Sequence, residues 1–101
     1  MKFLVLSRPR TDAPVPRDAL TLYQTAEEWL DSALKSGQID CVYQRVGGGG
    51  VAIVNADTAE ELWEGIASYP LTAQLEFQVE PLVDVRYAFN RVNEMLTRIS
   101  E

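Results

Sequence analysis

The chain has 101 residues, 47% of them hydrophobic and 24% charged, which is the composition of a single globular domain. Its formal net charge of −6 argues against nucleic acid and anionic membrane surfaces as partners. The sequence contains one cysteine, Cys41, and no histidine. An internal disulfide is therefore excluded, and the commonest metal ligand and acid–base side chain are missing. We expect no cofactor or metal, and a cytoplasmic location.

The first forty residues predict a strand, a loop and a helix. Lys2–Ser7 is a short apolar run with little alternation, typical of a central strand covered on both faces. The proline-rich segment Arg8–Arg17 predicts a loop, and it carries three basic residues. Pro16–Ser36 predicts a long helix because apolar residues recur at helical spacing, and Gly37 suits its C-terminal end.

The centre of the chain predicts a β-hairpin followed by a capped helix. Two β-rich runs flank Gly47–Gly50, and glycine supplies the positive φ that a tight connection needs. Strand alternation places four side chains on one face of the first run: Ile39, Cys41, Tyr43 and Arg45. After the hairpin, Thr58 and Glu61 have the spacing of a capping box, and Pro70 stops the helix.

The last third predicts a half-exposed strand and a third helix. Between Leu75 and Glu80 apolar and polar residues alternate strictly, and Pro81 closes the strand or marks a sheet edge. Asp84 is placed to cap a helix. Its apolar stripe consists of Val85, Phe89, Val92, Leu96 and Ile99.

The predicted order is β-α-β-β-α-β plus a terminal helix, which is the ferredoxin-like α+β arrangement with an antiparallel sheet and two helices on one face. Residues 1–82 would form this domain. Residues 83–101 would form a C-terminal helix packed on the same domain or across a dimer. Because several strands carry apolar residues on both faces, we predict a homodimer in which the uncovered sheet faces pack together.

The stretch GQIDCVYQRVGGGG, the Tyr69-Pro70-Leu71 turn and the closing strand LEFQVEPL carry a resemblance to a known family. Over about residues 37–82 the sequence resembles the muconolactone isomerase-like family of dimeric α+β-barrel proteins. The resemblance implies paired sheets and proton transfer within a small lactone or organic acid. Family enzymes carry histidines around this hairpin, where this chain has Cys41 and glycines. The terminal helix has no obvious counterpart in the family.

Lactone isomerisation needs a base for a proton beside a carbonyl and a donor that stabilises the enolate. We expect the candidate side chains to lie between the sheet and the first helix. Arg45 would hold a substrate carboxylate, with Tyr23 and Glu76 as further substrate-binding residues. Tyr43 and Tyr69 would be the catalytic hydrogen-bond donors. Tyrosines on amphipathic elements are more often core residues with a hydrated hydroxyl, and Arg45 could instead pair with an acidic neighbour.

Three hypotheses follow from the sequence. The first is an isomerase-type enzyme that acts on a small organic ligand. The second is a non-catalytic ligand-binding homodimer, favoured by the missing histidine. The third is a structural subunit, for which the terminal helix and the acidity are the hints. An enclosed cavity lined by Tyr43 and Arg45 would favour the first two.

Overall fold

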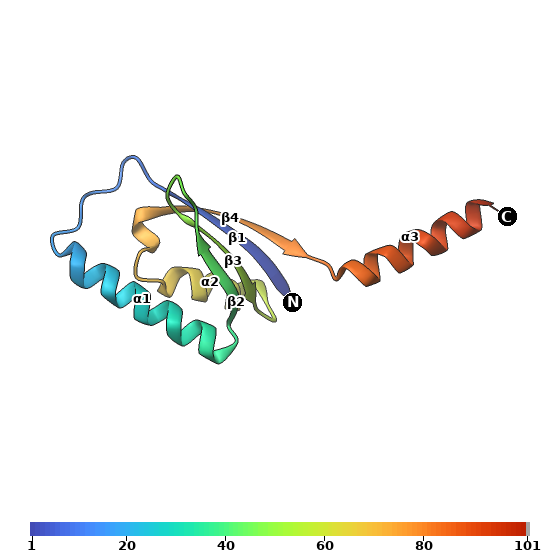
Figure 1. Cartoon of the computed structure of the whole chain (residues 1–101), viewed down its shortest axis with the longest axis horizontal. Helices are drawn as coiled ribbons and strands as arrows, with labels where there is room; N and C mark the ends of the chain where they lie inside the picture. Colours follow the sequence, from blue (N-terminus) through green and yellow to red (C-terminus); the bar gives the residue numbers. More distant parts are fainter. Residues whose placement is uncertain (101) are drawn as a thin grey trace.

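The computed structural model of the protein describes residues 1–100, in which a four-stranded sheet carries two helices on one face (Figure 1). The strand order is β2-β3-β1-β4, and every neighbouring pair is antiparallel. This confirms the ferredoxin-like α+β order predicted from the sequence, followed by a terminal helix. The elements are β1 (Lys2–Pro9), α1 (Ala19–Ser36), β2 (Ile39–Gln44), β3 (Gly50–Asn55), α2 (Ala59–Ser68), a 3-10 turn (Thr72–Gln74), β4 (Leu75–Leu82) and α3 (Val85–Ser100).

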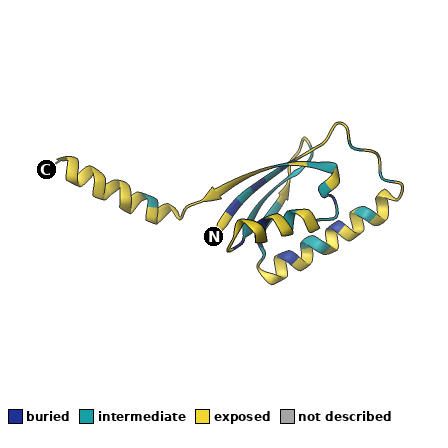
Figure 2. Cartoon of the chain, turned by 180° about the vertical axis from the view of Figure 1, so that it is seen from behind, coloured by how far each residue is buried: buried dark blue, intermediate teal, exposed yellow. Residues whose placement is uncertain are grey.

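The central strand β1 divides its side chains between the two faces of the sheet. Phe3, Val5 and Ser7 are buried, and the first two form a small core with Leu62 of α2. Leu4 and Leu6 alternate with them and are only partly covered, because both helices lie on the other face (Figure 2). None of the helices in residues 1–100 combines the length and apolar character needed to cross a membrane.

Local capping residues fix where the helices begin and end. The Asp18 carboxylate accepts the N–H of Thr21 at 3.2 Å, so α1 begins at Ala19 rather than at the predicted Pro16. Gly37 ends this helix at a φ of 81°. At α2 the predicted cap forms, since Thr58 Oγ1 accepts the N–H of Glu61 at 3.1 Å. The Glu61 carboxylate accepts the N–H of Asp57 at 3.1 Å, one residue before the Thr58 N–H of a regular capping box.

A β-bulge in β2 changes the predicted assignment of its faces. Ile39 pairs with Val54 and Cys41 with Ile53, so Asp40 is an extra residue in the strand. Ile39 therefore lies on the helix-covered face, whereas Cys41 and Tyr43 lie on the open one. The prediction that all of these side chains share one face was wrong for Ile39, because the bulge shifts the alternation by one residue.

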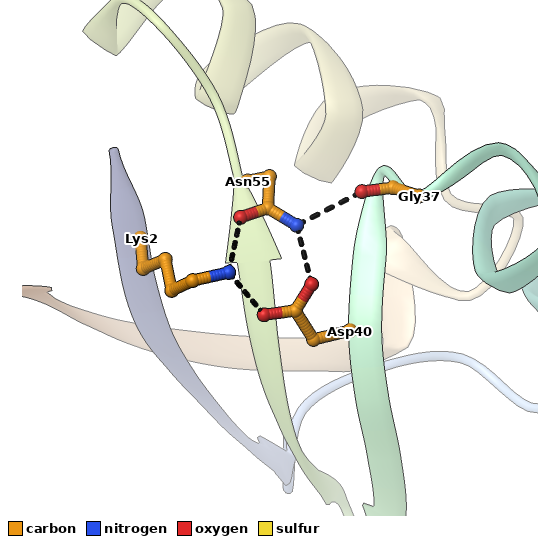
Figure 3. Close-up of polar contacts among 4 residues, drawn as sticks. All are labelled: Lys2, Gly37, Asp40 and Asn55. Atoms are coloured by element: carbon orange, nitrogen blue, oxygen red, sulfur yellow. Dashed lines mark hydrogen bonds and ion pairs between the residues drawn. The ribbon is translucent and has the colours of Figure 1, made fainter.

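The bulged Asp40 belongs to a polar network that joins three strands (Figure 3). The Lys2 ammonium donates to the Asp40 carboxylate and to Asn55 Oδ1, the latter at 2.9 Å. The Asn55 amide nitrogen donates to Asp40 at 2.6 Å and to the carbonyl oxygen of Gly37 at 2.9 Å. The hydrogen bond from Lys2, and then that from Asn55, lower the pKa of the Asp40 carboxyl.

We predict that Asp40→Asn lowers the free energy of unfolding at neutral pH. A carboxyl whose pKa is lowered by folding stabilises the fold above its unfolded pKa, and this contribution is lost as the pH falls through the folded pKa. The deficit of the variant should therefore shrink as the pH falls below the ordinary Asp pKa of 3.8 toward the lower pKa of the folded protein. Urea unfolding at about pH 7 and about pH 2.5 measures this difference.

Asp12→Asn is the matched control, since the Asp12 pKa is also lowered by a hydrogen bond, from Arg10. That partner lies two residues away in one loop, so the pair joins no strands. Asp12→Asn should lower the free energy of unfolding at neutral pH by less than Asp40→Asn does. An equal effect of the two substitutions would contradict a strand-joining role for Asp40.

The glycine run closes the hairpin and contacts the central strand. The N–H of Gly48 donates to the Arg45 carbonyl oxygen at 3.0 Å, and the N–H of Arg45 donates to the Gly49 carbonyl oxygen at 2.9 Å. Gly48 and Gly49 have φ values of 102° and 76°. A Cβ on Gly49 would lie 2.1 Å from the carbonyl oxygen of Ser7. Glycine is therefore required at this position by both conformation and space.

We predict that Gly49→Ala destabilises the protein by about 2–4 kcal/mol, because it combines left-handed strain with a backbone clash. Gly47→Ala is the matched control in the same turn, since a Cβ at Gly47 meets no atom within 4 Å. Denaturant unfolding of both variants checks the prediction. If Gly47→Ala lowered the free energy of unfolding as much as Gly49→Ala, the prediction would be wrong.

The face of the sheet away from α1 and α2 is uncovered in the single chain. The register pairs Leu4 with Ile53 and Leu6 with Val51, so these apolar side chains lie together on that face. We call this surface the open face. A second copy packed against it, as predicted from the sequence, remains a prediction.

Helix α3 extends away from the rest of the chain (Figure 1). Asp84 caps it by accepting the N–H groups of Arg86 and Tyr87 at 2.9 and 3.1 Å, as predicted. No residue of α3 is buried. The sequence predicted that this helix packs either on its own domain or across a dimer. In the structure it does not pack on its own domain. Packing across a dimer remains a prediction.

Candidate functional site

A cavity of about 100 Å³ lies between the sheet and the two helices that cover it. Val5 of β1, Ala52 of β3 and Phe77 of β4 form its floor, and α2 contributes Leu62 and Ile66. Trp29 and Leu30 of α1 line it as well. Its walls are thus mainly apolar. An apolar cavity of about 150 Å³ is known to bind benzene, so this space has the scale of a single small ring.

Tyr69 is the best placed chemical group of this cavity. It follows the last residue of α2, and its ring meets that of Trp29 edge-on, with centroids 5.1 Å apart. Burial, and secondarily the neighbouring Tyr23, raise the pKa of the Tyr69 phenol above its ordinary value of 10.0. At neutral pH its hydroxyl is therefore protonated and can donate a hydrogen bond to a carbonyl or enolate oxygen.

The remaining polar groups of the cavity are few. Ser7 lies on its sheet side, but its hydroxyl already accepts the N–H of Gly50 at 2.8 Å. Glu61 is the only carboxylate among the described residues that line the cavity. One of its oxygens accepts the N–H of Asp57 at 3.1 Å. Gln38 contributes an amide. One carboxylate and one phenol are thus the groups available for acid–base chemistry.

A second hollow, of about 250 Å³, lies at the glycine-turn end of the sheet. Arg8 and Arg45 line it together with Glu76, and Leu6 and Gln78 place it on the open face. We call it the arginine hollow. Neither arginine lies within 4 Å of a carboxylate in residues 1–100; the Arg45 guanidinium makes only a long contact, 3.5 Å, with the Ser7 carbonyl oxygen. Two cationic groups beside a hollow favour an anion there.

The structure separates the five candidate residues that the sequence singled out. Tyr69 lines the cavity, and Tyr23 lies near it on α1 with 59% of its surface exposed. Arg45 and Glu76 line the arginine hollow. Tyr43 lies on the open face opposite Val51, 67% exposed, and lines neither space. The expectation that all five lie between the sheet and the first helix was therefore wrong, because strand alternation turns three of them to the other face.

Sequence reasoning missed several residues of the cavity. Ser7 was part of a central strand, Glu61 was a helix cap, and Gln38 carried no recognised pattern. Their common site arises from contacts between elements far apart in the chain, which no local motif encodes. Within residues 1–100, histidine, cysteine, aspartate and glutamate side chains do not come together in groups of three that would suit a metal ion.

Comparison with protein families gives one match, which spans residues 1–96 and is described as "Domain of unknown function (DUF3303)". The chain belongs to this family. A search of curated proteins gave no match.

The solved structures that are similar in fold include two enzymes. One is the 5-chloro-2-hydroxyhydroquinone dehydrochlorinase TftG from Burkholderia phenoliruptrix AC1100, in complex with 2,5-dihydroxybenzoquinone. It has a TM-score of 0.67 and 16% identity over 86% of this chain and 98% of that one. The other is muconolactone isomerase, with a TM-score of 0.71 and 18% identity over 83% of this chain and 90% of that one. The resemblance noted from the sequence is thereby confirmed at the level of the fold.

Proposed function

We propose that this protein binds a small cyclic organic compound in the cavity between the sheet and the helices, and moves a proton within it. The observation that carries the proposal is an apolar cavity of single-ring scale with one protonated phenol, Tyr69. Ligand sites combine these features: apolar walls and a few polar groups that set orientation. That muconolactone isomerase and the quinone-bound dehydrochlorinase have the same fold is consistent with such a ligand.

The residues of the cavity can share the roles of a proton transfer. Tyr69 donates a hydrogen bond to the carbonyl oxygen of the ligand and stabilises the enolate that forms when the neighbouring carbon loses its proton. Where the ligand has a double bond beside that carbon, the enolate is a conjugated dienolate. Glu61 accepts the proton through the oxygen that does not cap α2, and returns it to the far carbon of the dienolate. Without Glu61 acting as a base, the same site is a non-catalytic binding site.

We predict that Tyr69→Phe weakens binding of phenol, catechol or γ-butyrolactone about two- to tenfold. This is the loss expected for one hydrogen bond of about 0.5–1.5 kcal/mol. Thermal shift identifies which of these probes binds, and calorimetry measures its affinity. Tyr43→Phe removes the same hydroxyl from a tyrosine outside the cavity, and should leave the affinity unchanged. Equal affinities for wild type and Tyr69→Phe would contradict the proposed role of Tyr69.

A second candidate function is recognition of an organic acid at the arginine hollow. The observation that favours it is that Arg8 and Arg45 line one hollow together with a single carboxylate, Glu76, which lies opposite Arg8 in the sheet but more than 4 Å from either guanidinium. In the dimer predicted from the sequence, the open faces meet and this hollow becomes part of the space between two sheets. Arginines taken out of water need an anionic partner, which a ligand carboxylate would supply.

We predict that Arg45→Met weakens binding of benzoate about ten- to a hundredfold, because a charge-assisted hydrogen bond contributes about 1.5–3 kcal/mol. For benzamide, which has no charge, the same substitution should reduce the affinity much less. Arg17→Met changes an arginine outside the hollow and is the control variant. Calorimetry with both ligands measures the affinities of the wild type and of both variants, six in all. An equal loss for benzoate and benzamide would show that Arg45 shapes the hollow without binding the carboxylate.

A further inference from the structure

Within residues 1–100, no other element covers the apolar surface of helix α3. Its 16 residues project past the end of β4, and the exposed fraction of its five stripe residues ranges from 49% to 79%. The chain measures 66 Å in its longest dimension, and its radius of gyration is 17.6 Å. A compact domain of this size has a radius of gyration of about 13 Å. In Figure 2 the helix is drawn as exposed along almost its whole length. An apolar helix face of this kind needs a partner.

The spacing of the stripe indicates what kind of partner it fits. Val85, Phe89, Val92, Leu96 and Ile99 follow one another at intervals of four, three, four and three residues. This spacing forms a narrow seam along one side of a helix, which is the pattern that packs against another helix. A surface of helices is therefore a better receptor for α3 than a flat sheet face.

Charge indicates which helices these are. Residues 85–100 contain three arginines and one glutamate, whereas residues 1–84 contain six basic and thirteen acidic residues. The exposed carboxylates of the body include Glu27, Glu28 and Asp31 on α1 and Glu60 and Glu64 on α2. Exposed apolar side chains lie on the same two helices, Tyr23 on α1 and Trp63 on α2. A basic helix with an apolar seam is complementary to this acidic helical layer.

We infer that α3 is an exchange arm, whose seam packs on the helices α1 and α2 of a second copy of this chain. A 16-residue helix is about 24 Å long, more than twice the roughly 10 Å between packed layers. It can therefore reach past the edge of a partner's sheet to its helical side. In a two-fold dimer each arm would make the same contact, which adds to the contact between the open faces.

The test compares two double variants of the full chain by sedimentation equilibrium. Phe89→Gln with Leu96→Gln changes the seam, and Asn90→Gln with Thr97→Gln introduces the same residue twice beside it on the same helix. We expect the wild type and the second variant to form dimers at micromolar concentration. The dissociation constant of the seam variant should be at least a hundredfold higher. Circular dichroism verifies that the seam variant is folded. A monomeric wild type, or a folded seam variant with unchanged dissociation, would overturn the inference.

A charge reversal tests which surface receives the arm. Arg86→Glu with Arg98→Glu should weaken the dimer about tenfold at low salt, and the difference should shrink at about 0.5 M salt because exposed charges are screened. Unchanged dissociation at low salt would show that α3 packs on an uncharged surface, such as the α3 of the other copy. That result would overturn docking on the acidic helical layer.

Discussion

The close approach of the glycine turn to the backbone of Ser7 is the constraint on which both candidate sites depend. Gly49 lies against the Ser7 carbonyl group, and the Ser7 hydroxyl accepts the N–H of Gly50 just beyond the last paired residues, Leu6 and Val51. This contact holds the tip of the β2–β3 hairpin against the central strand. Ser7 lines the cavity on one face of the sheet and the arginine hollow on the other. A shift of the hairpin would therefore change both spaces at once.

The features that the sequence predicts are those encoded by neighbouring residues. The capping of α2 by Thr58 and Glu61 and the capping of α3 by Asp84 are local patterns, and both form as expected. The strict alternation between Leu75 and Glu80 likewise predicts β4. These patterns fix the order of strands and helices, and the order determines the ferredoxin-like topology because few arrangements of a split βαβ unit avoid crossed connections.

The arrangement of the site is less accessible to sequence reasoning, because it depends on contacts between distant residues. The bulge at Asp40 is held by Lys2 and Asn55, which lie 38 and 15 residues away. Alternation correctly shows that Tyr43 and Arg45 point to the same side, but it does not show which side the helices cover. The cavity itself is built from all four strands and the two helices that cover them, and only Tyr69 among its residues was proposed as a functional group.

The absence of histidine from the sequence limits the chemistry that the cavity can perform. A phenol whose pKa is raised by burial is a hydrogen-bond donor at neutral pH and a poor base. In the proposed reaction the base is therefore Glu61, the one carboxylate that lines the cavity in residues 1–100. Carboxylates are weak bases, so the proposed reaction suits protons that are already acidic, such as those between a carbonyl group and a double bond. Unsaturated lactones and unsaturated cyclic ketones carry such protons, whereas saturated lactones and ketones do not. The proposed function thus favours unsaturated ring compounds as substrates over saturated ones.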